Sequence, residues 1–293
     1  MKKLLISILK AFLYIGVFLG VQVAVTLIVS VFFALLGEIM SYSMQVYDAD
    51  IWLTSNLLPT VTFLSGWLTL LFLGMFFAIR GKSLSGEVRW HKMPAPGSAI
   101  LGPLECGFGL SILASCAMAM IPFPDTWYDA YDASMEMLMS GNPLFLAAAT
   151  IIAAPLVEEV VFRGLVYTRL CRGMPRLIAA LLSAILFGLV HGTLLHLFYT
   201  IPMGLLLCLF YEKYRSLWAP IIMHMSFNLA GTVLGYYTYV PDIVIILLLV
   251  IGLYLTVLGL LSMRWYRRQT GIYQKPKIAE VTPVSDPELP LST

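Results

Sequence analysis

The chain has 293 residues, of which 60% are hydrophobic and only 12% are charged. Soluble proteins are about 45–50% apolar and about 25% charged. This composition, with a mean hydropathy of +0.88, therefore indicates a membrane protein whose surroundings are a lipid bilayer. It excludes a soluble enzyme, a nucleic-acid-binding protein and a disordered chain. The net charge of +2 says little about partners, so the positions of the charges matter more than their sum.

Eight apolar segments are candidates for membrane-spanning helices. Such a helix needs about 20 predominantly apolar residues. Runs bounded by charges, Pro or Gly lie at 11–36, 52–79, 98–122, 143–168, 177–195, 197–211, 217–238 and 243–263. The first run is too long for the apolar part of a signal peptide and lacks a small-residue cleavage site. We therefore predict an all-α, polytopic membrane bundle of about eight transmembrane helices, the first of them retained.

The loops between these segments alternate in charge. Lys and Arg precede segment one and follow segments two, four, six and eight, whereas the other loops contain no Lys or Arg. Among the basic residues are Lys92, Lys275 and Lys277, and Asp48 is among the acidic ones. Because positively charged loops face the cytoplasm, the N- and C-termini are both predicted to be cytoplasmic.

Two regions outside the predicted spans have a distinct composition. The stretch 123–139 mixes aromatic, acidic and Met residues, which favours a short helix at the level of the lipid headgroups. After Arg268 the chain is polar and contains several prolines, which is typical of disorder. We therefore divide the chain into N-terminal transmembrane segments with an outer interfacial loop, a core, a last transmembrane helix and a disordered cytoplasmic tail, at 1–142, 143–240, 241–268 and 269–293.

Four charged residues lie inside the apolar segments: Glu105, Glu158, Glu159 and Arg163. An ionisable group at that depth costs about 2.5–3.5 kcal/mol on insertion scales, so each is a functional candidate. Glu105 lies only about two turns from the start of its segment and can reach the interface. Glu159 and Arg163 are four residues apart on one helix face and are predicted to pair. Glu158, turned about 100° away, has no local cation and is a candidate general base.

The histidines add further polar groups to the apolar segments. His191 and His224 fall inside segments five and seven, and His196 lies at the short outer turn after segment five. His224 and Asn228 are four residues apart, so they present two hydrogen-bonding groups on one helix face. Polar groups on three helices of an apolar bundle find only one another and water as partners. We therefore expect Glu158, His191 and His224 to converge at a water-filled cavity open to the cytoplasm.

Three motifs follow one another on successive predicted helices: Glu158-Glu159-x-x-x-Arg163, Phe187-x-x-x-His191 and His224-x-x-x-Asn228. They resemble the motifs of the CAAX-processing and bacteriocin-processing (CPBP) family of intramembrane proteases. The resemblance covers about 155–230, inside the predicted core, which it identifies as the catalytic part. It implies an endopeptidase that cuts a membrane-associated protein or peptide in or near the membrane.

The resemblance also implies a role for each motif residue. Glu158 and His191 would activate a water molecule. His224 and Asn228 would bind the oxyanion of the tetrahedral intermediate. Glu159 and Arg163 would shape the site, and Phe187 would support it. This division fits general chemistry, because a base polarises water while positioned donors stabilise the developing charge.

Metal dependence stays open at this point. Glu158, His191 and His224 are also a zinc ligand set, and proteases with such a set use zinc-bound water. The chain lacks the compact His-Glu-x-x-His helix signature, and Asn228 suits oxyanion binding better than a closed metal shell. We favour a mechanism without metal or other cofactor, with a zinc-dependent protease as the alternative.

Two other function classes predict different features. A non-catalytic membrane scaffold or immunity protein would keep the polar residues for packing, and a transporter would show paired broken helices in two halves, which this sequence lacks. Intact motifs favour the protease. The short loops resemble those of the family's prokaryotic members, so we expect a multi-pass protein of the prokaryotic plasma membrane. The sequence determines neither the substrate and its prenylation, nor the pathway, nor the oligomeric state.

Overall fold

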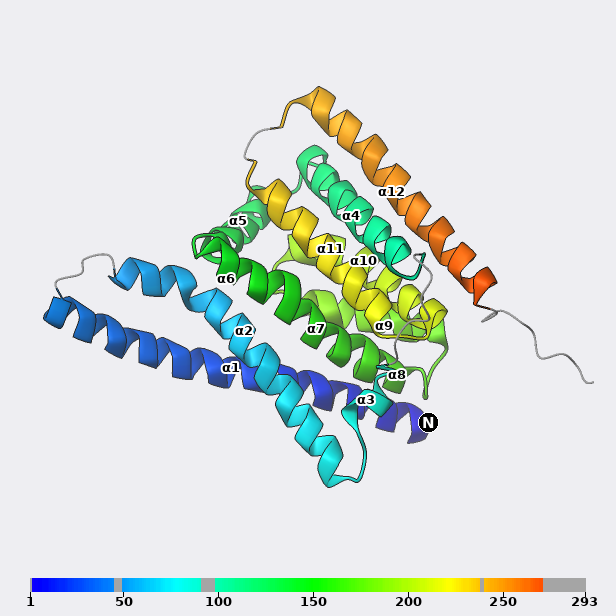
Figure 1. Ribbon diagram of the computed structural model, residues 1–293, viewed down its shortest axis with the longest axis horizontal. Helices are drawn as coiled ribbons and strands as arrows, with labels where there is room; N and C mark the ends of the chain where they lie inside the picture. Colours follow the sequence, from blue (N-terminus) through cyan, green and yellow to red (C-terminus); the bar gives the residue numbers. More distant parts are fainter. Residues whose placement is uncertain (1, 45–48, 91–97, 238–239, 271–293) are drawn as a thin grey trace, which may run out of the picture.

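The computed structural model describes residues 2–44, 49–90, 98–237 and 240–270, and these form helices and no strand (Figure 1). The helices pack into one bundle, which confirms the predicted all-α membrane architecture. The predicted disordered tail lies outside the described residues from position 271 on, as do Asp48, Lys92, Lys275 and Lys277.

Within the described residues, six helices are long and apolar enough to cross a membrane: Lys2–Met40, Trp52–Ile79, Ala99–Met120, Pro143–Leu170, Leu194–Tyr214 and Asp242–Gln269. The helix Arg176–Leu189 is apolar but shorter, and Trp218–Gly235 has 18 residues. Each of the eight predicted segments therefore contains a helix. The number of spans and their orientation in the membrane stay predictions.

The N-terminal part forms a pair of long helices on one side of the bundle. Helices α1 (Lys2–Met44) and α2 (Ala49–Ile79) pack antiparallel, and the short α3 (Leu84–Glu87) follows (Figure 1). Much of the apolar surface of α1 is exposed, including Leu27 at 64% and Ile28 at 69%. Such a surface suits contact with lipid chains rather than with water.

A central helical segment runs from Pro143 to Leu170 through the middle of the bundle (Figure 1). Two stretches of π-helix interrupt its α-helical geometry. In chain order it consists of α6 (Pro143–Ala147), η1 (Ala148–Ala153), α7 (Ala154–Glu159), η2 (Val160–Tyr167) and α8 (Thr168–Leu170). All residues of η2 are buried, so this segment forms the centre of the core. Because π-bulges often occur at functional sites, the segment is also where a site is expected.

The remaining helices cover the other side of the central segment. They are α4 (Ser98–Met120), α9 (Arg176–Leu189), α10 (Leu194–Tyr214), α11 (Trp218–Gly235) and α12 (Asp242–Gln269). Helices α9 and α10 pack together as a hairpin, and α4 packs between α11 and α12 (Figure 1). This arrangement places α11 against the central segment, so two of the three motifs come from neighbouring elements.

Glycines let α4 and α12 approach closely. Glu105, an acid inside an apolar segment, finds its hydrogen-bond partner across this contact. A Cβ atom at Gly109 would lie 2.5 Å from the backbone nitrogen of Thr256, so this position has room only for glycine. Small residues at helix interfaces serve this purpose in membrane proteins. Beside this contact, Ser262 Oγ donates a hydrogen bond of 2.9 Å to Glu105 Oε2. Glu105 thus joins α4 and α12, neither of which carries a motif residue.

The predicted short outer helix is present as α5 (Asp125–Met139). It packs against α10 and α2. Tyr128 Oη lies 2.9 Å from the carbonyl oxygen of Met118 and 2.7 Å from that of Ile121. The Met118 carbonyl lies in the last turn of α4, where no further helical N–H is available, and the Ile121 carbonyl, which also accepts from the N–H of Phe123, follows directly after this helix. The side chain therefore closes the turn between α4 and α5.

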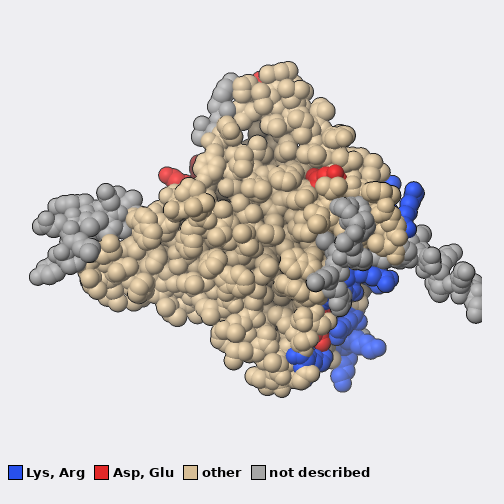
Figure 2. All heavy atoms as spheres, in the orientation of Figure 1, with Lys and Arg blue, Asp and Glu red and all other residues tan. Residues whose placement is uncertain are grey.

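Charged side chains gather at one end of the bundle. Figure 2 shows Lys and Arg together at one end and a broad surface almost without charge elsewhere on this face. The first residues of α1 and the last residues of α12 lie toward the same end (Figure 1). This is the end that the sequence predicts to face the cytoplasm, and we call it the basic end.

Two histidines differ from their predicted places. Helix α9 ends at Leu189, so His191 lies in a turn and not inside a helix. The turn forms because Gly192 has φ +83°, a conformation that favours glycine. Thr193 then caps α10, accepting a 3.2 Å hydrogen bond from the backbone N–H of His196. His196 therefore belongs to the first turn of α10, and the turn that the sequence predicted at His196 lies a few residues earlier.

Candidate active site

Pro155 shapes the central segment where Asn228 meets it. The backbone N–H of Ala154 donates to the carbonyl of Ala149, five residues back. The next residue, Pro155, has no N–H, so the carbonyl of Thr150 lacks the corresponding helical donor. Asn228 Nδ2 supplies one at 2.8 Å. The proline thus creates a backbone acceptor inside the bundle, and Asn228 on α11 fills it.

Glu159 is the centre of a buried polar cluster, which confirms its predicted pairing with Arg163. Arg163 Nη1 donates a 2.8 Å hydrogen bond to Glu159 Oε1, and both side chains are 0% exposed. His224 Nδ1 lies 2.8 Å from the same oxygen. Because an ionised carboxylate only accepts, this contact assigns the proton to Nδ1 of His224. The carboxylate therefore orients His224 as well as pairing with Arg163.

Glu158 lies beside this cluster but is more accessible. Its side chain is 15% exposed, whereas that of Glu159 is fully buried. Glu158 Oε2 lies 3.6 Å from His224 Nε2, which is too long for a good hydrogen bond. The sequence had left Glu158 without a local partner, and the tertiary structure provides His224 as a neighbour. Of the two adjacent acids, Glu158 is the one that can reach a water molecule or a substrate.

Phe187 packs among the polar side chains of the site and is itself fully buried. Its ring centroid lies 4.7 Å from that of His191, 5.7 Å from that of His224 and 4.4 Å from Arg163 Cζ. The last contact has cation–π geometry. These contacts from three elements explain why an aromatic residue occupies this position, and they limit the orientations that the two imidazoles can adopt.

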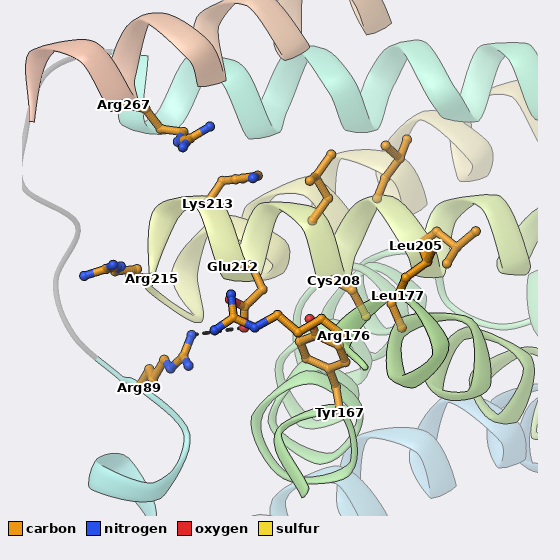
Figure 3. Close-up of a pocket in the computed structure, with 13 residues that line it drawn as sticks. Arg89, Tyr167, Arg176, Leu177, Leu205, Cys208, Glu212, Lys213, Arg215 and Arg267 are labelled. Carbon is orange, nitrogen blue, oxygen red and sulfur yellow. Dashed lines mark hydrogen bonds and ion pairs between the residues drawn. The ribbon is translucent and has the colours of Figure 1, made fainter. Parts of the chain in front are cut away.

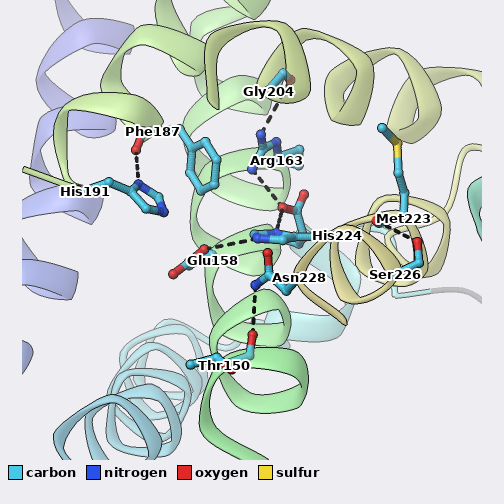
Figure 4. Close-up of polar contacts among 11 residues, drawn as sticks. Thr150, Glu158, Arg163, Phe187, His191, Gly204, Met223, His224, Ser226 and Asn228 are labelled. Carbon is cyan, nitrogen blue, oxygen red and sulfur yellow. Dashed lines mark hydrogen bonds and ion pairs between the residues drawn. The ribbon is translucent and has the colours of Figure 1, made fainter. Parts of the chain in front are cut away.

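The orientation of His191 follows from a backbone contact. Its Nδ1 lies 2.8 Å from the carbonyl oxygen of Phe187, which can only accept, so Nδ1 carries a proton. The other ring nitrogen points in the direction of Glu158 in Figure 4. Both residues are in the described part of the chain, and no hydrogen bond joins them. The structure thus brings Glu158, Glu159, Arg163, Phe187 and His224 into contact, with His191 on the far side of the Phe187 ring.

His196 is a neighbour of the site to which the sequence had assigned no role. Its ring stacks on His191 with a centroid distance of 5.7 Å and an interplanar angle of 30°. Thr193 Oγ1 lies 2.6 Å from His196 Nδ1, and the ring of Tyr131 on α5 is 4.9 Å away. The Thr193-x-x-His196 spacing, typical of a helix start, is the signal that could have placed it.

Glu158, His191 and His224 are the side chains that a zinc ion would need as ligands at this site. Among the described residues, no group of three His, Cys, Asp or Glu side chains is placed to hold a metal ion. The Nδ1 atoms of His191 and His224 are already engaged, so only their Nε2 atoms are available. Such contacts at Nδ1 are also the ones that orient metal-binding histidines, so the observation that bears on zinc is the position of Glu158 relative to the two Nε2 atoms.

Comparison with known proteins identifies the part of the chain that carries this geometry. Residues 140–230 match the family described as type II CAAX prenyl endopeptidase Rce1-like. The resemblance predicted from the three motifs is therefore confirmed for this segment. All the motif residues, from Glu158 to Asn228, lie within this Rce1-like segment.

A curated protein matches part of the same chain. It is a protein of Bacillus subtilis (strain 168) named "Putative membrane peptidase YdiL", and it is 31% identical over 86 residues. The match covers 29% of this chain and 35% of that protein, so this chain aligns with about a third of the length of its curated relative. No solved structure matches the chain. The six long apolar helices show a multi-pass membrane protein, and the likeness to membrane peptidases is carried by its Rce1-like segment.

Proposed function

We propose that this protein is an intramembrane endopeptidase that hydrolyses a peptide bond of a membrane-associated protein or peptide. The observation that carries the proposal is the approach of the Glu158 carboxylate to the imidazole of His224. Glu158, which is partly exposed, lies 3.6 Å from His224 Nε2, while Glu159 holds the other nitrogen of His224 at 2.8 Å. A positioned base next to a positioned donor is what amide hydrolysis requires.

Glu158 acts as the general base. Its carboxylate takes a proton from a water molecule, whose oxygen then bonds to the carbonyl carbon of the substrate. His191 accepts a hydrogen bond from the same water at Nε2, which is available because Nδ1 donates to the Phe187 carbonyl. Protonated Glu158 next gives its proton to the departing amine as the carbon–nitrogen bond breaks. A residue in this role contributes about 10²–10⁴-fold to the rate.

His224 and Asn228 stabilise the oxyanion. Because Nδ1 of His224 is held by Glu159, a donor role at Nε2 requires a proton on both ring nitrogens. In this form Nε2–H is a donor and Nδ1–H stays on Glu159. Asn228 Nδ2 carries a second hydrogen besides the one on the Thr150 carbonyl. Loss of one such donor costs about 10²–10³-fold in kcat.

This mechanism needs no metal ion. The arrangement of the described donors supports that part of the proposal, because three of them do not converge on one point. The test uses the purified protein with a strong chelator, followed by zinc. Unchanged cleavage is expected. Inhibition that zinc reverses, together with stoichiometric zinc in the purified protein, would favour the zinc-dependent alternative.

The decisive experiment compares membrane-associated and secreted peptides from cells that carry the wild-type protein or Glu158→Gln. A precursor should accumulate only in the variant, and its sequence would identify the substrate, prenylated or not. Glu105→Gln is the matched control, because it removes an acid that contacts Ser262 outside the motif cluster. Identical peptide profiles for wild type and Glu158→Gln, with an unchanged phenotype, would favour a non-catalytic scaffold. Fractionation of the same cells tests the proposed location in a prokaryotic plasma membrane.

A further inference from the structure

An open pocket of about 880 Å³ lies at the basic end of the bundle (Figure 3). Helices α9 and α10 supply most of its walls. Tyr167 at the end of η2, Arg89 in the turn after α3 and Arg267 in the last turn of α12 complete it. None of the motif residues lines this pocket. It is therefore separate from the candidate active site and is not needed for the proposed chemistry.

One part of the pocket is strongly cationic. Its lining includes a single acid, Glu212, and five basic residues, Arg89, Arg176, Lys213, Arg215 and Arg267. Glu212 makes ion pairs of 3.4 and 3.5 Å with Arg89 and Arg176. Glu212 alone cannot balance even the four cations other than Arg267, so the lining keeps an excess of positive charge. The electrostatics of the pocket therefore favour an anionic ligand.

Helix α9 adds backbone donors at the same place. It begins at Arg176, which lines the pocket, and its N-cap residue Pro175 makes no side-chain hydrogen bond to the first turn. The first N–H groups of a 14-residue helix thus lie beside the cations. Helix N-termini of this kind favour phosphate and other anions.

The other part of the pocket is apolar. Its lining there consists of Leu177, Ala180, Leu205, Leu206 and Leu209. Figure 3 shows Leu177 and Leu205 on one side of the view and Arg89, Arg215 and Lys213 on the other. Leu177 is 78% exposed, so the apolar part is open at the surface of the bundle. A ligand that fits both parts must carry an anionic group and hydrocarbon.

We propose that this pocket binds an anionic phospholipid of the leaflet at the basic end. The phosphate lies among Arg176, Lys213 and Arg215, and an acyl chain runs over Leu177 toward the outer surface. Charge complementarity selects this occupant, because basic pockets between membrane helices at the cytoplasmic side bind anionic headgroups. The volume also suits a headgroup with the first part of its chains.

The test measures lipid binding to the full-length chain in detergent by native mass spectrometry. Phosphatidylglycerol and phosphatidylcholine with identical acyl chains are the probes. The wild-type protein should retain phosphatidylglycerol and little phosphatidylcholine. In Arg176→Gln/Lys213→Gln, affinity for phosphatidylglycerol should fall about 30-fold, from about fivefold for each cation removed. If the wild-type protein retained both lipids equally, this result alone would overturn the proposal, whatever the variants show.

A matched control separates a site from general attraction of charge. Arg264→Gln/Arg268→Gln removes two exposed cations of α12 at the same end, outside the pocket lining. It should bind phosphatidylglycerol as the wild type does, and an equal loss in both double variants would refute a specific site.

Competition distinguishes other occupants. Displacement of the lipid by millimolar inorganic phosphate, or by an acidic peptide without hydrocarbon, would show that the apolar part contributes nothing. Neither result bears on cleavage by Glu158.

Discussion

Asn228 donates its side-chain amide to the backbone carbonyl of Thr150 at 2.8 Å (Figure 4). This contact ties α11 to the helical segment that carries the two acids. It depends on Pro155, whose missing N–H leaves the Thr150 carbonyl without a helical donor. A backbone irregularity at one point of the core thus decides where the third motif meets the first.

Replacing Pro155 by alanine should separate stability from activity. The new N–H can donate to the Thr150 carbonyl, so Asn228 loses its fixed partner. We expect cleavage to fall by about 10²–10³-fold, the range for loss of an oxyanion donor. Thermal stability should stay equal or rise, because proline is unfavourable inside a helix. Substrate turnover and the melting temperature of the purified protein are the measurements.

The control for this change is Pro103→Ala in α4, another proline inside a helix but away from the motifs. It should leave cleavage unchanged. Wild-type turnover in Pro155→Ala would show that the Thr150 contact does not position Asn228.

The neighbouring acids Glu158 and Glu159 should respond differently to the same substitution. Glu159→Gln removes the carboxylate from a pair that is 0% exposed and leaves Arg163 buried without its counter-ion. Such a loss costs about 3–5 kcal/mol, so we expect poor accumulation and a lower melting temperature. Glu158→Gln should fold normally yet lose about 10²–10⁴-fold in cleavage. Unfolding in graded denaturant, beside turnover, distinguishes the two; equal stability of both variants would contradict this reading.

Gly107 is a steric requirement of the contact between α4 and α11. A Cβ atom there would overlap Ser226 Oγ and the carbonyl oxygen of Met223, next to His224. Gly107→Ala should therefore destabilise the protein by about 3 kcal/mol, at the upper end for overpacking. Gly16→Ala is the control, since nothing lies within 4 Å of a Cβ atom at that position. If Gly107→Ala unfolds at the wild-type midpoint, α4 and α11 can move apart at this position without a loss in the free energy of unfolding.

The docking of the segment after α2 should weaken in acid. The hydrogen bond from Lys82 at 2.8 Å, together with the charge of Arg169 2.9 Å away, holds the pKa of Glu87 below its ordinary value of 4.5. The stabilisation is therefore fully present above about pH 4.5 and is lost as the pH falls through the lowered pKa. Hydrogen exchange of backbone amides in 82–90 should accelerate in that range.

The matched variant for this pH effect is Glu87→Gln, which cannot ionise. Its exchange in 82–90 should be fast already at neutral pH and should not change further as the pH falls from about 6 through the lowered pKa of wild-type Glu87, beyond the intrinsic chemistry of exchange. A wild-type-like pH profile in this variant would assign the effect to another group.

The helices and the positions of the costly intramembrane charges were predictable because both depend on local rules. An apolar run of about 20 residues forms a helix in lipid wherever it occurs. A charge within such a run is costly enough to need a reason, which is how Glu158, Glu159 and Arg163 stood out. The pairing of Glu159 with Arg163 is also local, since the two are four residues apart on one helix. Continuous hydrophobicity shifted the predicted turn between segments five and six to His196, whereas the structure places it between Leu189 and Leu194.

The contacts that assemble the site were decided by the tertiary structure. His224 binds Glu159 from 65 residues away, and Asn228 binds Thr150 from 78 residues away. No periodicity reports such pairs, because they depend on the packing of α11 against a segment with two π-helical stretches. The same applies to the stacking of His196 on His191 and to the basic pocket at the ends of α9 and α10. Sequence alone determined which groups are expensive to bury in a membrane; only the packed bundle determined which partners make their burial favourable.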